Sequence, residues 1–185
     1  MSTYDRLLEI ADTLIGKNGF EGFSYADLAK EMGIRKASIH YHFPTKTDLG
    51  IAYCELKMKA FADFEAYITT LPVGPRQIAA YIDAFSVYAK KGQMCGVHAM
   101  LSDSNLYESG LKAAVQKLAD YELRIISKIL QRGQEAGLLK FDIPVEDMAL
   151  IVCYSVKGAL LINRTPPHNA SERNAHALLK MLENR

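Results

Sequence analysis

The chain has 185 residues, enough for one domain or for a small domain joined to a larger one. Apolar residues make up 49% of it and charged residues 23%, which excludes disordered, fibrous and low-complexity classes. The formal net charge of +1 averages regions of different charge, and by itself it excludes no class of partner.

Nothing in the sequence indicates a membrane or a secreted protein. The longest apolar stretch, Met148 to Ile162, is interrupted by Lys157 and is shorter than the roughly 20 residues of a membrane span. The N-terminus lacks the apolar segment of a signal peptide. The three cysteines are widely spaced without a C-x-x-C pair, which argues against a disulfide scaffold or a zinc site. We therefore expect a cytoplasmic protein without membrane contact, metal or other cofactor.

The predicted elements are helices, because no run shows the apolar/polar alternation of a half-buried strand. An S/T-x-x-D capping signature starts three of them, at Ser2, Ser24 and Thr45. Between Gly92 and a loop at 102–105 lies a shorter element that carries Cys95 and His98. We expect an all-α fold with helices at about residues 3–18, 24–33, 36–42, 45–70, 76–91, 111–136, 145–163 and 171–183.

The second and third predicted helices are typical of a helix-turn-helix, because both are short and a glycine turn joins them. Leu28, Met32, Ile34 and Ile39 supply apolar contacts between them, and Gly33 permits a turn with positive φ. A helix in the major groove of DNA needs polar side chains for base edges and phosphates. The residues that meet this need here are Arg35, Lys36, Ser38, His40, Tyr41 and His42.

These residues support a resemblance to a known family. Its motifs are the runs Phe20-Glu21-Gly22-Phe23-Ser24-Tyr25-Ala26-Asp27-Leu28-Ala29 and Ile34-Arg35-Lys36-Ala37-Ser38-Ile39-His40-Tyr41-His42-Phe43-Pro44-Thr45-Lys46-Thr47-Asp48-Leu49. The sequence there resembles the DNA-binding domain of the tetracycline-repressor (TetR/AcrR) family of bacterial transcriptional regulators. His40 stands where the family usually has Tyr, and Ala37 where Gly or Pro is common, which leaves the base preference open.

The resemblance implies a helix-turn-helix DNA-binding domain at residues 1–48 and a helical ligand-binding and dimerisation domain at 49–185. It places Lys36, Ser38 and Tyr41 on the recognition helix and Ser24 and Lys46 against phosphates. The alternative is an ordinary helical hairpin with a solvated basic face. A metal pair of His40 and His42 is excluded, because residues two apart on a helix point in different directions. The predicted DNA-binding residues are Ser24, Arg35, Lys36, Ser38, His40, Tyr41, His42 and Lys46.

The C-terminal region offers candidates for an effector pocket, which would be mostly apolar with a few polar groups. In some members of the family a cysteine near position 95 reacts with electrophiles or oxidants, and His98 would assist Cys95 if the intervening turn were helical. The alternatives are an inert buried thiol and ordinary core packing. The predicted ligand-binding residues are Tyr53, Phe64, Phe85, Tyr88, Met94, Cys95, His98, Tyr121 and Tyr154.

The family resemblance also implies that the last two helices pair with those of a second copy. Their apolar and small residues allow close helix approach, although the same faces would equally pack inside one subunit. The predicted dimer residues are Val152, Ser155, Val156, Ala159, Leu160, Ala177, Leu178 and Met181.

Together these features predict a homodimeric regulator, a repressor, that binds a palindromic operator in double-stranded DNA. A small-molecule effector, or a reactive electrophile or oxidant, would release it by moving the helix at 45–70. Two alternatives stay open. One is a helical interaction protein that has lost DNA binding. The other is an enzyme that uses Cys95 and His98. The sequence argues against this alternative, because it offers no third residue that would orient the histidine.

Overall fold

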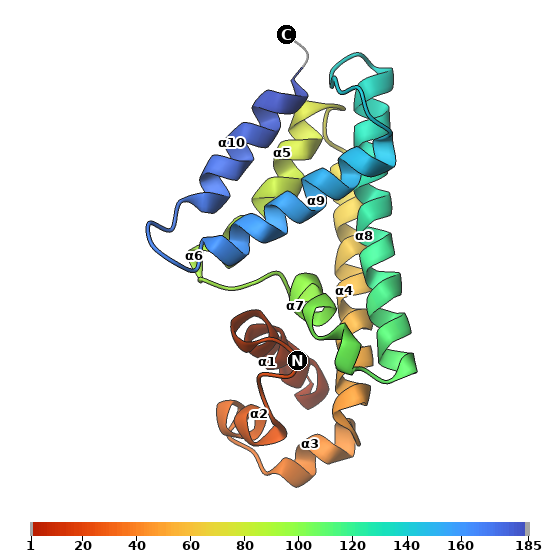
Figure 1. The fold of residues 1–185 in the computed structure, drawn as a ribbon. Helices are drawn as coiled ribbons and strands as arrows, with labels where there is room; N and C mark the ends of the chain where they lie inside the picture. Colours follow the sequence, from red (N-terminus) through yellow and green to blue (C-terminus); the bar gives the residue numbers. More distant parts are fainter. Residues whose placement is uncertain (1, 184–185) are drawn as a thin grey trace. The chain divides into compact units, whose positions relative to one another are not determined.

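The computed structural model describes residues 2–183, and within this range the all-α prediction is confirmed. No β-strand occurs among these residues, although a lone bridge pairs Leu139 with Glu183. None of the described helices combines the length and the apolar character that crossing a bilayer requires. The elements, in chain order, are α1 (Thr3–Asn18), α2 (Tyr25–Met32), α3 (Lys36–His42), α4 (Lys46–Ile68), α5 (Pro75–Ala84), α6 (Ser86–Lys90), α7 (Gly96–Ser102), the short 3-10 helix η1 (Ser104–Leu106), α8 (Ser109–Glu135), α9 (Val145–Ile162) and α10 (Ala170–Leu182) (Figure 1).

The predicted capping signatures are confirmed at three helix starts. In each, the hydroxyl of the first residue donates to the carboxylate three residues later, which also accepts the backbone N–H of that first residue. The hydroxyl-to-carboxylate distances are 2.8 Å for Ser2–Asp5, 2.7 Å for Ser24–Asp27 and 2.8 Å for Thr45–Asp48.

The prediction of one helix over residues 76–91 is wrong. The helix is interrupted at Phe85, so that α5 ends at Ala84 and α6 begins at Ser86. The backbone N–H of Phe85 donates to the Ile82 carbonyl at 3.0 Å, three residues back, and this tightens the turn. The side chain of Phe85, at the break, is buried. The predicted loop at 102–105 likewise contains the start of η1.

The chain forms two compact units, and α4 and α8 each contribute residues to both. The first unit consists of Met1–Ala60 and Gly96–Ala119, and the second of Phe61–Cys95 and Asp120–Arg185. These units describe packing. The predicted functional boundary at residue 48 stays a prediction.

In the first unit α1 packs on α2 and α7, and α2 packs on α3. Tyr53 of α4 is fully buried, and its hydroxyl donates to Asp12 Oδ1 of α1 at 2.8 Å. Lys57 Nζ lies 2.7 Å from the same oxygen. A Cβ at Gly96, the first residue of α7, would overlap the Tyr53 hydroxyl. Glycine at position 96 therefore lets α7 approach this contact between α1 and α4.

In the second unit α10 packs on α9 and on α5. Figure 1 shows α10 and α5 side by side, with α9 next to them. The core between these helices and the second half of α8 is aliphatic and aromatic, and its largest buried members include Ile78, Tyr81, Ile126, Leu130, Val152, Leu160 and Leu178.

Candidate nucleic-acid interface

The turn between α2 and α3 has the geometry that a helix-turn-helix requires. Gly33 has φ +70°, a left-handed conformation that glycine adopts at little cost. The N–H of Ile34 then donates to the Ala29 carbonyl at 3.1 Å, which closes the end of α2. Leu28 and Ile39 are fully buried between the helices. The predicted packing of this pair is therefore present in the structure.

The opposite side of α3 is exposed and polar. Ile39 is the buried anchor, whereas five of the predicted DNA-binding residues on or next to α3 face solvent, and His42 is half-buried. Tyr41 has 84% of its surface exposed, which is unusual for an aromatic side chain that has no binding partner. The exposed residues are Arg35, Lys36, Ser38, His40 and Tyr41.

Two cations of this surface are available to an anion. Arg35 and Lys36 are exposed, and neither forms an ion pair with any residue in the range 2–183. Thr3, Ala37, Ser38 and Tyr41 line a shallow hollow beside them. Unpaired cations next to an exposed aromatic ring suit contacts with phosphates and base edges.

Two aromatic residues that the sequence analysis did not single out support this surface. The Tyr25 hydroxyl donates to the carbonyls of Phe43 and Thr45, at 2.9 and 2.6 Å, and so holds the turn between α3 and α4. Burial, and to a smaller extent the nearby Asp48 carboxylate, raise the pKa of Tyr25 to about 12. Tyr4 packs on Phe43, with ring centroids 4.9 Å apart. Neither contact has a local sequence signal, because its partners lie on other elements.

His40 differs from the other exposed residues of α3, because its ring is already anchored. Its Nδ1 lies 3.1 Å from the Pro44 carbonyl, and its ring packs against Tyr25 with centroids 4.9 Å apart. The structure therefore places His40 at the end of the helix, tied to the turn that follows.

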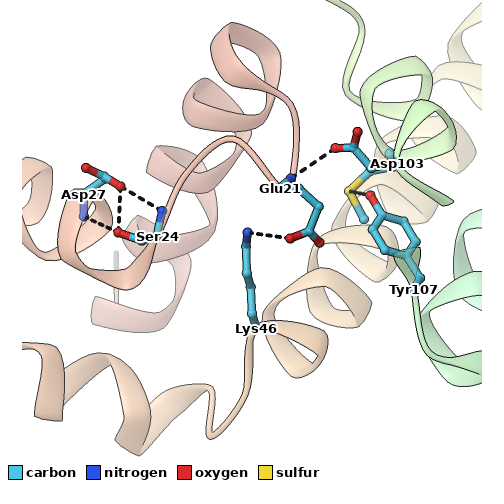
Figure 2. A network of polar contacts seen from close by, with 7 residues as sticks. Glu21, Ser24, Asp27, Lys46, Asp103 and Tyr107 are labelled. Carbon is cyan, nitrogen blue, oxygen red and sulfur yellow. Dashed lines mark hydrogen bonds and ion pairs between the residues drawn. The ribbon is translucent and has the colours of Figure 1, made fainter. Parts of the chain in front are cut away.

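Ser24 and Lys46, the predicted phosphate contacts, already have partners within the chain (Figure 2). The Ser24 hydroxyl takes part in the capping box of α2, and Lys46 Nζ lies 3.4 Å from Glu21 Oε2. The Lys46 ammonium also lies over the rings of Phe20 and Phe23, 4.8 and 4.9 Å from their centroids. A phosphate at Lys46 would therefore have to compete with Glu21, and both contacts stay predictions.

Figure 2 also shows what holds Glu21. Its backbone N–H donates to Asp103 Oδ2 at 3.1 Å, so the residue after α7 fastens the turn between α1 and α2. Gly19 has φ +83°, and a Cβ there would lie 3.2 Å from the same Asp103 oxygen. Glycine at this position thus leaves room for the carboxylate. From the sequence, Asp103 was predicted only to lie in a loop. Its contact with Glu21 could not be predicted, because the two residues lie 82 positions apart.

The predicted ligand-binding residues are distributed over both units. Tyr53 and His98 belong to the first unit, and the other seven belong to the second. The second unit contains a cavity of about 390 Å³, and Phe85 is the one predicted residue among those that line it. Phe64 and Phe85 both contact Tyr81, with ring centroids 6.4 and 5.1 Å away, as members of an aromatic cluster. Tyr121 instead donates to Glu65 Oε2 at 2.9 Å.

Cys95 is buried and lies directly before α7, which contains His98. The reactivity of this thiol stays a prediction. Among the other thiols, burial raises the pKa of Cys54 to about 12 and that of Cys153 to about 11. Both of these are therefore protonated and poorly nucleophilic at neutral pH.

A buried ionic network in the second unit was not anticipated. Lys157 of α9 lies 2.5 Å from Glu122 Oε2 of α8 and 3.2 Å from Cys153 Sγ, and the Tyr81 hydroxyl donates to Glu122 Oε1 at 2.9 Å. Lys157 and Glu122 each expose 1% of their side chains. Desolvation lowers the pKa of Lys157, but Glu122, Cys95 and Cys153 outweigh it and raise the pKa above its ordinary value. The sequence does contain one signal for this network, because Lys157 is a charged residue within an apolar run. Its partner Glu122 has no comparable signal.

Five of the eight predicted dimer residues are buried inside the chain: Val152, Val156, Ala159, Leu160 and Leu178. Ser155 is half-buried, while Ala177 and Met181 are exposed. The apolar residues that α9 exposes are different ones, and none of them was among the predicted dimer residues. They are Leu150, Ile151, Tyr154, Leu161 and Ile162, each with between 38% and 65% of its surface exposed.

Comparisons with known proteins agree with this geometry. Residues 7–53 match the family model described as "Bacterial regulatory proteins, tetR family". A curated relative, the "Biofilm operon icaADBC HTH-type negative transcriptional regulator IcaR" of Staphylococcus aureus strain Newman, is 38% identical over 45 residues. That match spans only 24% of this chain and 24% of the relative.

Two solved structures share the fold over nearly the whole chain. A TetR-family transcriptional regulator from Agrobacterium tumefaciens superposes with a TM-score of 0.90 at 25% identity, covering 98% of this chain and 97% of that one. A TetR transcriptional regulator from Legionella pneumophila gives 0.87 at 24% identity, covering 99% and 98%. The helix-turn-helix region therefore matches the tetR family of bacterial regulatory proteins in sequence, and the chain as a whole has the fold of TetR-family regulators.

Proposed function

We propose that the protein is a DNA-binding transcriptional repressor that acts as a homodimer on a palindromic operator and is released by an effector. The observation that carries the proposal is the solvent-facing side of α3, where Tyr41 is 84% exposed beside the unpaired cations Arg35 and Lys36. An exposed ring and two cations on a helix anchored by Ile39 match what a recognition helix presents to the major groove. Repression is the function of the relative from Staphylococcus aureus, a negative transcriptional regulator.

The homodimer is supported by the exposed apolar side of α9. Leu150, Ile151, Tyr154, Leu161 and Ile162 lie on one helix, and each leaves between 38% and 65% of its surface exposed. A contiguous apolar surface of this kind marks a protein interface. A second copy of the chain would bury it, and Met181 of α10, half exposed, would extend the contact. Two recognition helices would then meet successive major grooves, about 34–36 Å apart.

The release signal is a small molecule or a reactive electrophile or oxidant. A small molecule is favoured by the cavity of the second unit, whereas the burial of Cys95 opposes rapid reaction. Coupling to DNA would require the effector to bind two conformers with different affinity, and α4 contributes residues to both units. If Cys95→Ser responds to an electrophile as the parent does, the thiol is not the sensor.

The experiment that tests the function is selection from a random duplex library by the purified protein, followed by a salt titration of the enriched sequence. We expect a palindrome, with binding that weakens steeply as salt rises because phosphate contacts release counterions. Tyr41→Ala should weaken binding about tenfold or more without loss of helicity, as expected for a lost base or phosphate contact.

Tyr67→Ala is the matched control, because Tyr67 is also exposed, at 55%, but lies near the far end of α4. It should bind the operator as the parent does. If no sequence is enriched, or if Tyr41→Ala binds with full strength, the proposed role of α3 is wrong, and a helical interaction protein becomes the better description.

A further inference from the structure

The second unit contains a cavity whose lining includes one of the predicted ligand-binding residues, Phe85. It has a volume of about 390 Å³ and lies between α5, α6, α9 and α10. Ile82, Phe85, Val156 and Leu160 line it with buried apolar side chains. The break at Phe85 starts α6 beside it, and Ser86 and Ala89 of α6 contribute to the lining. Size and apolar walls are those of a site for a small molecule.

One part of the lining is polar and is built around Asn163. This side chain is 6% exposed, its Nδ2 reaches the Ala89 carbonyl only at 3.5 Å, and its Oδ1 accepts the backbone N–H of Ser171 at 3.3 Å. The Ser171 hydroxyl is buried and forms no hydrogen bond with any residue that the structure describes. A buried hydroxyl without a partner is unfavourable, so a ligand that supplies one gains affinity.

The charges around the cavity decide the class of ligand. Asp83, Lys90 and Glu172 are of both signs and are exposed to solvent, whereas the buried polar groups, Asn163 and Ser171, are uncharged. An ionic ligand group in the buried part would lose its hydration without gaining a buried counter-ion. A neutral group that both donates and accepts, or only accepts, meets no such cost.

We propose that this cavity is the effector site, and that it takes a neutral, mainly apolar molecule carrying one hydroxyl or carbonyl group. Its role as effector site rests on the regulatory function proposed above. The apolar body lies against Ile82, Phe85 and Val156, and the oxygen pairs with the Ser171 hydroxyl. Ile82 follows Tyr81 on α5, and Val156 precedes Lys157 on α9. A ligand in the cavity therefore contacts two helices that carry members of the buried ionic network.

Prodan is a suitable probe, because it is a neutral naphthalene with one ketone and its emission shifts to the blue in an apolar site. We expect saturable Prodan binding to the full-length protein in a fluorescence titration. Ala175→Leu adds volume at a residue that lines the cavity and should weaken binding at least about tenfold, by filling the site. Ser171→Ala should weaken it about two- to tenfold, as for one lost neutral hydrogen bond.

Ala66→Leu is the matched control, since it makes the same change at an exposed helix position of the second unit that does not line the cavity. It should bind Prodan as the parent does, and circular dichroism should show equal helicity in all variants. Equal binding by Ala175→Leu and the parent, or no saturable binding at all, overturns the site.

Operator binding is measured on the same samples, so that the two proposals fail separately. Prodan binding that Ala175→Leu abolishes, in a protein that binds no DNA, leaves the site in place and overturns the regulatory function. Operator binding without Prodan binding leaves the regulatory function in place and overturns the proposed effector site. Tight binding of the anionic probe anilinonaphthalene sulfonate at the same site, competing with Prodan, contradicts the neutral class of ligand.

Discussion

The helix starts of the first unit and the ion pair in the core of the second unit satisfy their polar groups in opposite ways. In the first unit the hydrogen bonds that start α1, α2 and α4 are exposed and join residues three apart. In the second unit Lys157 and Glu122 are sealed from solvent and lie 35 residues apart. Exposed caps add stability in small increments, and a change in one leaves the others intact. A buried ion pair is different, because losing either partner leaves a charge without water or counter-ion.

The largest effect should come from breaking the buried pair. Lys157→Met leaves the Glu122 carboxylate buried next to an apolar side chain, and we expect a loss of about 3–5 kcal/mol in the free energy of unfolding. Urea denaturation at neutral pH measures it. The double variant Lys157→Met with Glu122→Leu should recover much of the loss, because it removes both charges.

Lys128→Met provides the matched control from the same unit. Lys128 pairs with Glu65 at 2.5 Å, but half of its side chain is exposed. Removing it should cost no more than about 1 kcal/mol, because water screens the pair. If Lys157→Met is no more damaging than Lys128→Met, the contrast between the units is wrong.

A smaller effect is expected at the close approach of α7 to α4 in the first unit. The added Cβ of Gly96→Ala overlaps the Tyr53 hydroxyl, whose hydrogen bond to Asp12 must then move. We expect a loss of about 1–3 kcal/mol, measured as a lower urea midpoint. Gly110→Ala is the control, because its nearest neighbour, Ile51 Cδ1, lies 3.9 Å away, and alanine favours the helix there.

The smallest effect concerns pH and the capping box of α2. The hydroxyl and N–H of Ser24 hold the pKa of Asp27 below its ordinary 3.8. Because the folded-state pKa is the lower one, this carboxylate stabilises the fold above pH 3.8, and the contribution is lost as the pH falls through the folded-state value.

We therefore expect Asp27→Asn to be less stable than the parent near neutral pH, with the two chains converging in acid as the pH falls through the folded-state pKa of Asp27. Thermal melts across this range measure the difference. A gap that stays constant down to pH 2.5 would show that the Asp27 charge is not what stabilises the helix start.

The helix-turn-helix region could be predicted from sequence because its determinants are local. Ser24 and Asp27 mark the start of α2, Gly33 marks its end, and the spacing of Leu28 and Ile39 indicates the buried side. Each acts through residues a few positions away, so a short window of sequence contains both partners. The exposed residues of α3 followed from the same periodicity.

In the C-terminal region, helical periodicity did not predict which side of each helix is buried. The small and apolar residues chosen on α9 turned out to be buried, while Leu150, Ile151 and Ile162 are exposed. Both faces of this helix are apolar, so periodicity does not distinguish the face that packs inside the chain from the one that is left outside. Among the aromatic candidates for the pocket, only Phe85 lines the cavity that the described residues form in the second unit, because aromatic residues fill any helical core.

The sequence by itself determined where most helices begin and end, and which surface of α3 is polar, because backbone capping and helical period depend on near neighbours. Only the tertiary structure decided that Lys157 meets Glu122, that Asp103 fastens the turn at Glu21, and that a cavity lies beside Ser171. These features join segments far apart in the chain, and close packing between them selects which side chains meet.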